Sequence, residues 1–477
     1  MTAGTGPPAD PDPATPGNRP AQDSAAGLTL RPNAATDADV QAGVPDTPAR
    51  VPIFSALRER NYRLYFTGQM ISNTGTWMQR IAQDWLVLEL TGSPLAVGIT
   101  TALQFLPVLL FGLLGGLVID RYPKRSILVV TQALMGLLAV TLAALTLSGI
   151  VTVWSVYLVA FALGMVTVVD NPTRQVFVNE MVPARLVRNA VSLNTATFQL
   201  ARLVGPAVAG VLIAATGSGW AFAINALSYV ATIAALLAMR ADQLHRLPRA
   251  PREPGQLREG LRYVAARPHI LWIIVMVFFI GTFGYNFSVF LSAYAKNVFD
   301  SGADVYGLLN TAVAIGSVSG AVLAARRATV RLGFLFAVSG AFSALMIAAG
   351  ITPWLLAFMG VLAVLGLAST SFSTTANASV QLASDAQVRG RVMSLYMMVF
   401  MGGTPIGGPI AGAITDKLGA PAGMIICGSI CLVATVTCAA LAARQSGVRL
   451  RVDRHLVPVR RLVNANAVER DAESPAT

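Results

Sequence analysis

Twelve long apolar runs are the feature that most constrains how this chain can fold. A helix needs about 20 mostly apolar residues to cross the hydrocarbon core of a bilayer, and each run is of that order. Charged residues make up 12% of the chain and hydrophobic residues 54%, whereas a soluble domain carries about 25% charged residues. The polar residues are too few to cover so many apolar side chains in water, so we predict an all-α integral membrane protein. The runs are 64–90, 95–119, 126–149, 152–176, 191–216, 219–240, 270–295, 304–326, 332–350, 353–375, 392–415 and 421–443.

The basic residues predict how the runs are oriented. The formal net charge is +12, and most of the bases lie in alternate loops between the runs. Cytoplasmic loops of membrane proteins carry such an excess, so we expect both termini and the long central loop on the cytoplasmic side of the plasma or inner membrane. Bases scattered in this way also argue against a nucleic-acid partner. The basic loops contain Arg58, Arg60, Arg63, Arg121, Lys124, Arg125, Arg185, Arg188, Arg326, Arg327, Arg331, Arg389 and Arg391.

The chain divides into two halves that resemble each other. "VRNAVSL" at 187–193 recurs as "VRGRVMSL" at 388–395, and each leads into a Gly-Pro pair. Two related six-helix bundles around a cleft are typical of alternating-access transporters. We therefore predict five parts: a disordered cytoplasmic tail at 1–52, a six-helix bundle at 53–240, a cytoplasmic linker at 241–268, a second bundle at 269–443, and a cytoplasmic tail at 444–477. "LREGLRYVAAR" in the linker predicts a short basic amphipathic helix, either on the inner membrane surface or as a solvated connector.

The loop between the second and third runs carries a recognisable motif, "GGLVIDRYPKR". It resembles the signature loop of the major facilitator superfamily, Gly-x-x-x-Asp-Arg-x-Gly-Arg-Arg, with Pro123 in place of the second Gly. The resemblance covers about residues 55–443 and implies the twelve-helix major facilitator fold. It also implies a conformational latch of the outward-facing state, in which Asp120 faces the eleventh span near Arg391 and the bases stay at the lipid headgroups. Purely topological charge is the alternative. The motif residues are Gly116, Asp120, Arg121, Lys124 and Arg125.

Three further stretches narrow the resemblance. "GTWMQRIAQDWLVLELTGSPLAVG" at 75–98 and "DNPTRQVFVNEMVP" at 170–183 resemble a bacterial efflux branch that includes the enterobactin exporter and macrolide-efflux-like proteins. "ARLVGPAVAG" at 201–210 resembles the fifth-span signature of proton-coupled drug antiporters, although Ala201 replaces its first Gly and Gly210 is displaced by one. A seam of small residues that pack helices explains this motif as well. The Gly-Pro motifs comprise Gly205, Pro206 and Gly210, and Gly408, Pro409 and Gly412.

Charged side chains inside the predicted spans call for a reason, because each costs about 3 kcal/mol at the bilayer centre on insertion scales. Arg80, Asp84, Asp170 and Arg202 lie within spans, and Arg174 lies at the inner end of the fourth. The first span also carries a polar stripe whose spacings of 4, 3, 4 and 4 keep it on one helix face. The stripe is Gln69, Asn73, Thr76, Arg80 and Asp84.

Two spacings of four residues allow ion pairs within a helix. Arg80 can pair with Asp84, and Asp170 with Arg174. One interpretation makes these carboxylates and the central Arg202 a proton route, with Asp84 towards the outside and Asp170 towards the cytoplasm. The other makes them structural ion pairs that hold the N-terminal half together.

The sequence lacks the motifs of other classes of membrane protein. No Gly-Lys-Ser/Thr phosphate loop occurs, the three histidines form no pair, and the three cysteines fall in the last run without metal-ligand spacing. We therefore expect no enzyme, no cofactor and no metal. The prediction is a secondary active transporter, functional as a monomer, that exports an amphipathic small molecule in exchange for protons. An importer or facilitator of a small polar solute is the alternative, and a non-transporting sensor a remoter one.

Overall fold

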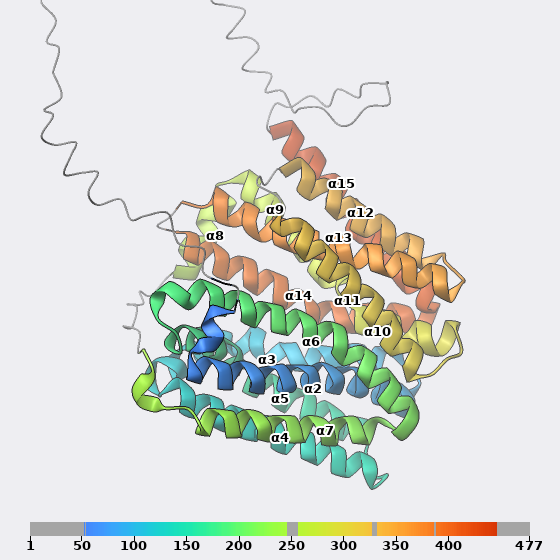
Figure 1. The fold of residues 1–477 in the computed structure, drawn as a ribbon. Coiled ribbons are helices and arrows are strands. Elements are labelled where there is room, and N and C mark those ends of the chain that lie inside the picture. Colours follow the sequence, from blue (N-terminus) through green and yellow to red (C-terminus); the bar gives the residue numbers. More distant parts are fainter. Residues whose placement is uncertain (1–51, 53, 246–255, 327–331, 386–387, 446–477) are drawn as a thin grey trace, which may run out of the picture. The chain divides into compact units, whose positions relative to one another are not determined.

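Every regular element in the described ranges is a helix (Figure 1). The computed structural model describes residues 52, 54–245, 256–326, 332–385 and 388–445. The predicted tails at 1–52 and 444–477 lie almost wholly outside these ranges, and so does the middle of the linker. Among the described residues, eleven helical segments are long and apolar enough to cross a membrane. With α2 (Arg60–Thr91) they make the twelve spans that the apolar runs predict.

The first span, α2, is 32 residues long but less apolar than the others. It is less apolar because it carries the polar stripe. Gln69 and Asp84 of this stripe are buried against other helices rather than exposed to lipid. The helix ends at Gly92, whose φ of 67° lies in the left-handed region that glycine tolerates best. The polar face of α2 therefore points into the protein, as the spacing predicts.

The first six spans pack around α2 in the N-terminal half. Helix α2 packs on α6 and α7, α4 packs on α5 and α7, and α3 packs on α5. Their bounds are α3 (Pro94–Arg121), α4 (Lys124–Leu147), α5 (Val153–Glu180), α6 (Val187–Thr216) and α7 (Ser218–Leu237).

The second six spans form the C-terminal half, and their first member is interrupted. An α-helix gives way to a π-helical turn and then to a break at Tyr285 and Asn286. An interrupted helix leaves backbone N–H and C=O groups without their helical partners, and in transporters such groups line a cavity. The bounds are α9 (Pro268–Phe279), η4 (Ile280–Gly284), α10 (Phe287–Ala293), η5 (Tyr294–Val298), α11 (Ala303–Ala325), α12 (Leu332–Gly350), α13 (Leu355–Ala383), α14 (Arg389–Leu418) and α15 (Ala420–Gln445).

The linker contains the short helix that the sequence predicts, α8 (Gln256–Ala265). Its end is fastened to the C-terminal half. The backbone N–H of Asp385 donates to the Tyr263 hydroxyl at 3.0 Å, and the Asp385 carboxylate pairs with Arg267 at 2.9 Å. The linker helix therefore reaches the loop between α13 and α14.

The two halves meet closely at one end, which we call the sealed end: the end of α2, the start of α3, the last turns of α6 and α14, and the start of α11. Helix α3 packs on α14 and α6 packs on α11. Glycines permit this approach. A Cβ added to Gly408 would lie 2.7 Å from the Gly98 carbonyl oxygen, and one added to Gly210 would lie 3.1 Å from Gly307 Cα.

Hydrogen bonds also join the halves at the sealed end. Ser93 donates to Asp416 at 2.8 Å, and Lys296 donates to the carbonyl oxygen of Leu88 at 2.9 Å. Both bonds cross between residues far apart in the chain. The sealed end is thus held by close backbone packing and by polar contacts together.

Candidate functional site

The Asp170–Arg174 pair forms as predicted. Nε of Arg174 lies 2.5 Å from Oδ2 of Asp170, and Asp170 is only 1% exposed. The other carboxylate oxygen of Asp170 accepts from Thr131 at 2.7 Å and from Gln132 at 2.9 Å, both on α4. Arg174 in turn donates to Gln69 of α2. The pair therefore ties α2, α4 and α5 together, and its oxygens are fully engaged.

The Arg80–Asp84 pair does not form, although its spacing is the same. No ion pair joins these side chains within the described part of the chain. The Arg80 guanidinium instead lies over the ring of Trp77, 4.9 Å from the centroid, and 5.9 Å from that of Phe105. The reason is geometric. Helical side chains lean towards the N-terminus of their helix, so Arg80 points back towards Trp77 and away from Asp84.

Asp84 turns to the other half of the protein. It is 5% exposed, and its carboxylate accepts a hydrogen bond from the Tyr306 hydroxyl of α11 at 3.1 Å. Trp85 stacks on the same tyrosine, with ring centroids 6.0 Å apart. Ser288 of α10 lies beside this carboxylate as well. Asp84 thus sits at the interface between the halves, at the sealed end.

Arg202 of α6 shares the aromatic surface that Arg80 uses. Its guanidinium lies 5.7 Å from the centroid of Trp77. The charges of Arg202 and Arg80 are close enough to repel each other, and the Tyr285 phenol of the other half is within electrostatic reach of Arg202. Arg202 therefore faces the region between the halves.

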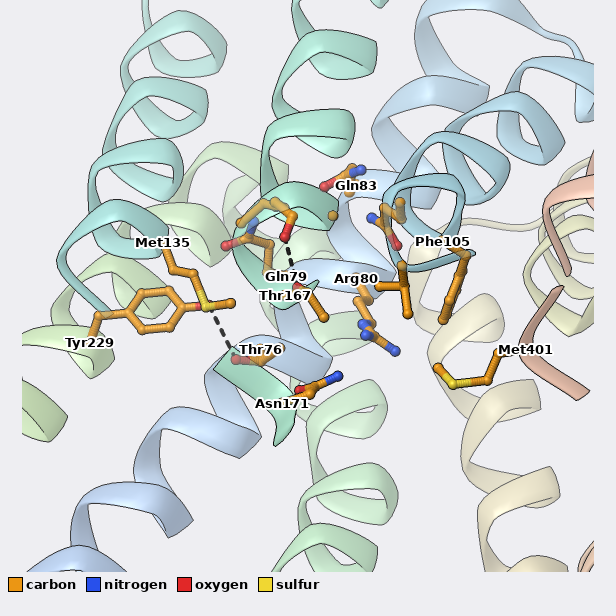
Figure 2. A pocket seen from close by; sticks show the side chains of 14 residues that line it. Thr76, Gln79, Arg80, Gln83, Phe105, Met135, Thr167, Asn171, Tyr229 and Met401 are labelled. Carbon is orange, nitrogen blue, oxygen red and sulfur yellow. Dashed lines mark hydrogen bonds between the residues drawn. The ribbon is translucent and has the colours of Figure 1, made fainter. Parts of the chain in front are cut away.

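A polar pocket surrounds Arg80. Figure 2 shows the Arg80 side chain reaching into the space between Phe105, Asn171 and Met401. Met401 belongs to α14, so the pocket touches both halves. All of its polar lining comes from the N-terminal half: Thr76, Gln79, Arg80, Gln83, Gln104, Thr167, Asn171 and Tyr229.

The amides of this pocket were not among the site residues predicted from the sequence. Gln79 and Gln83 flank Arg80 on the same helix and are spaced by four residues, a signal that was available. Gln83 is fully buried, yet neither polar atom of its amide has a hydrogen-bond partner among the described residues. Gln79 accepts from Asn225 at 2.5 Å. Tyr306 carried no local signal, because its role depends on contact with the opposite half.

The other predicted positions of the polar stripe differ in use. Gln69 accepts the hydrogen bond from Arg174. The Thr76 hydroxyl lies 3.3 Å from that of Tyr229. Asn73 is half-buried, and it does not line the pocket around Arg80. The stripe thus serves the fold at its start and the pocket at its centre.

The loop motif places two of its bases on protein rather than at lipid headgroups, which corrects that expectation. Lys124 pairs with Glu180 of α5 at 3.0 Å. Arg125 donates to the carbonyl oxygens of Leu236 and Leu237, at 2.7 and 2.9 Å. Unsatisfied carbonyl oxygens at a helix end attract such cations. Arg121 is exposed, and the surroundings of Gly116 and the side chain of Asp120 lie outside the described part of the structure.

Both Gly-Pro motifs lie in tight helix contacts. A Cβ added to Gly205 would lie 2.6 Å from Trp77 Cβ, so α6 and α2 touch there. Gly210, Gly408 and Gly412 face the opposite half at the sealed end; for Gly412 the neighbour is Leu95. Pro206 and Pro409 lie inside their helices. These positions pack helices, and they do not line the pocket around Arg80.

Twelve membrane-length helices in two halves, with a polar pocket in the N-terminal half that reaches Met401 of the other half, are the architecture of a multi-pass membrane transporter. The comparison with known families agrees. The chain belongs to the transmembrane secretion effector family of the major facilitator superfamily, whose model matches residues 51–462.

Characterised relatives are distant but consistent in kind. The chain is 23% identical to the staphyloferrin A transporter of Staphylococcus aureus over 258 residues, 54% of this chain and 64% of that protein. It is 24% identical to the enterobactin exporter EntS of Escherichia coli over 356 residues, 74% of this chain and 85% of that one. Macrolide efflux protein A of Streptococcus pyogenes is 24% identical over 174 residues, 36% and 43% of the two chains.

Solved structures share the fold. A bacterial homologue of the human lysosomal transporter Spinster, in an inward-facing and unoccupied conformation, superposes with a TM-score of 0.62 at 15% identity and covers 83% of this chain and 98% of its own. The nucleoside transporter NupG gives 0.63 at 13% identity, covering 81% and 99%. The major facilitator fold implied by the loop motif is thereby confirmed.

Proposed function

We propose that this transporter exports an amphipathic small molecule in exchange for protons, acting as a monomer in the plasma or inner membrane. The sealed end would face the outside, with both termini and the linker in the cytoplasm. The arginine-rich loops support this orientation, because Arg63, Arg121, Arg188 and Arg391 lie at the helix ends opposite the sealed one. The bundles at 53–240 and 269–443 would rock against each other.

The observation that carries the proposal is the contact between Asp84 and Tyr306. It joins a buried carboxylate of one half to a hydroxyl of the other at the sealed end. When the halves separate there, the contact must break and water must reach Asp84 from the outside. A carboxylate that is buried in one state and wet in the other can exchange protons with one side at a time, which is what coupling requires.

Asp170 suits a structural role better than a proton-carrying one. Three donors hold its two oxygens, and all three belong to the N-terminal half. A rocking motion of that half as a body leaves these contacts unchanged. We therefore assign the proton to Asp84 and assign Asp170 with Arg174 to the fold.

The loop motif supports a conformational role in the same account. Lys124 and Arg125 fasten the start of α4 to α5 and α7. Asp120 would then be presented by a rigid loop to the start of α14, and it would engage there when the halves close at the cytoplasmic end. The latch of the outward-facing state remains a prediction in this form.

Export is the direction that the named relatives support. Two of them are called an enterobactin exporter and a macrolide efflux protein. The aromatic surface beside Arg80 suits a cargo with an apolar body. Import of a small polar solute is the competing function, and the direction of flux decides between the two.

The test is flux driven by a pH gradient in proteoliposomes, measured against a panel of amphipathic compounds. We expect at least one compound to move against its gradient towards the acidic side, with the movement abolished in Asp84→Asn. Glu89→Gln is the matched control. Glu89 is an exposed residue on the same helix, and its carboxylate accepts a hydrogen bond from the indole N–H of Trp85. Wild-type coupling in Asp84→Asn would remove Asp84 from the mechanism, and transport towards the alkaline side would favour the importer.

A further inference from the structure

Two arginines near the pocket, Arg80 and Arg202, have no acidic partner beside them. Arg80 and Arg202 come from the neighbouring helices α2 and α6, and both guanidinium groups lie over Trp77. Neither forms an ion pair or a hydrogen bond within the described part of the chain. Charged side chains inside a membrane protein are expensive, and they are normally paired or functional. Two cations on one aromatic ring therefore call for a counter-ion.

The nearby acids do not supply it. Asp170 is taken by Arg174. The carboxylate of Asp84 bonds to Tyr306, although its charge still reaches Arg80. Two positive charges against one negative charge leave a net charge of +1 on Arg80, Arg202 and Asp84 together.

The pocket also offers spare hydrogen-bond donors. Gln83 is fully buried, lines the pocket with Arg80, and has an amide with no partner among the described residues. Gln104 and Asn171 line the same space. Buried polar groups are nearly always satisfied. The Gln83 amide can donate or accept, but an arginine can only donate, so the two together indicate a ligand with acceptor oxygens.

Aromatic side chains line the region on both sides. Trp77 meets Phe198 edge to face at 5.7 Å, and Phe105 lies beside Arg80. In the opposite half, Tyr285 packs on Phe400 at 5.5 Å. Such walls bind the apolar body of a ligand and leave its orientation to the polar groups.

We propose that the cargo is an amphipathic anion whose carboxylate, or an equally acidic oxygen group, is held by Arg80 and Arg202 against Trp77 while Gln83 donates to its remaining oxygen. This inference rests on the proposed export function and deepens it by naming the charge class of the substrate. It separates an acidic cargo from a basic one, which the relatives do not.

An anionic cargo has a consequence for energetics. A membrane potential that is negative inside pushes anions outward, and 100 mV supports an accumulation ratio of about 50-fold for each charge moved. The potential would therefore assist export of an acid, whereas it would oppose export of a base.

The test uses three probes of one shape: 2-naphthoate, which is anionic, 2-naphthamide, which is neutral, and 2-naphthamidine, which is cationic. Binding to the purified full-length protein in nanodiscs is measured by calorimetry. We expect naphthoate to bind at least about tenfold more tightly than naphthamide, as charge-assisted hydrogen bonds predict, and naphthamidine to bind most weakly.

Substitutions then locate the site. Arg80→Gln and Arg202→Gln should each weaken naphthoate binding about tenfold and should leave naphthamide binding nearly unchanged. Arg188→Gln is the matched control, because Arg188 lies exposed on the same helix as Arg202, and it should change neither affinity.

Equal affinity for the three probes, or a preference for naphthamidine, would overturn the inference without any variant being needed. So would unchanged naphthoate binding in folded Arg80→Gln and Arg202→Gln proteins. These binding results do not depend on transport. Loss of the charge preference with proton-driven flux intact would sink this inference alone, whereas the charge preference without proton-driven flux would sink the proposed coupling alone.

Discussion

The N-terminal half contains two acid–arginine spacings of four residues with opposite outcomes. In Asp170–Arg174 the acid comes first, so the arginine leans back along the helix onto it and the ion pair closes. In Arg80–Asp84 the arginine comes first and leans away, onto Trp77. Acid-first order is also the better one in isolated helices. The order of the residues thus decides which pair holds the fold and which pair keeps its charges available.

The largest expected effect comes from breaking the closed pair. Arg174→Gln leaves Asp170 buried without its cation, which costs about 3–5 kcal/mol in comparable buried pairs. We expect a strong loss of folded, monodisperse protein and a much lower unfolding temperature, measured by fluorescence-detected size exclusion and thermal unfolding. Arg63→Gln, an exposed arginine at the start of α2, serves as the control. Wild-type stability of Arg174→Gln would show that the pair does not hold the half together.

The contact of Asp84 with Tyr306 gives the next effect. Tyr306→Phe removes one hydrogen bond to a charged group, worth about 1.5–3 kcal/mol, from the sealed end alone. The equilibrium should shift by about tenfold or more towards opening at that end.

This shift is measured by thiol labelling of Ala303→Cys, since Ala303 is 3% exposed at the start of α11 while the end is closed, and the native Cys427, Cys431 and Cys438 are buried. Tyr294→Phe is the control, since that hydroxyl bonds to Ala349 and Gly350 within the C-terminal half. Equal labelling rates with and without Tyr306→Phe would mean that this contact does not help to close the end.

The smallest effect is expected from the open pair itself. Arg80→Gln removes a cation that has no ion-pair partner among the described residues. The free energy of unfolding should therefore change by less than about 1 kcal/mol. The same thermal unfolding assay measures it beside Arg174→Gln. A loss as large as that of Arg174→Gln would show that Arg80 is a structural residue and would erase the contrast between the pairs.

The spans and the polar face of α2 could be predicted from the sequence, because they depend on local apolarity and helical spacing, whereas the major facilitator fold is implied by the resemblance of the loop motif. The same spacing predicts both ion pairs, but among the described residues only Asp170–Arg174 forms. The fate of Arg80 required attention to side-chain direction as well as spacing. The contacts of Lys124 and Arg125 with protein, and the bond between Tyr306 and Asp84, depend on which helices become neighbours. Residues 84 and 306 are 222 positions apart, and no local pattern joins them.

The most direct test compares the two carboxylates in one assay. Flux driven by a pH gradient is measured for Asp84→Asn and Asp170→Asn in proteoliposomes and is normalised to the amount of folded transporter. The account predicts that Asp84→Asn folds normally and loses its response to the gradient, while Asp170→Asn yields less folded protein that still responds. The reverse pattern, with coupling lost at Asp170 and kept at Asp84, would contradict the account.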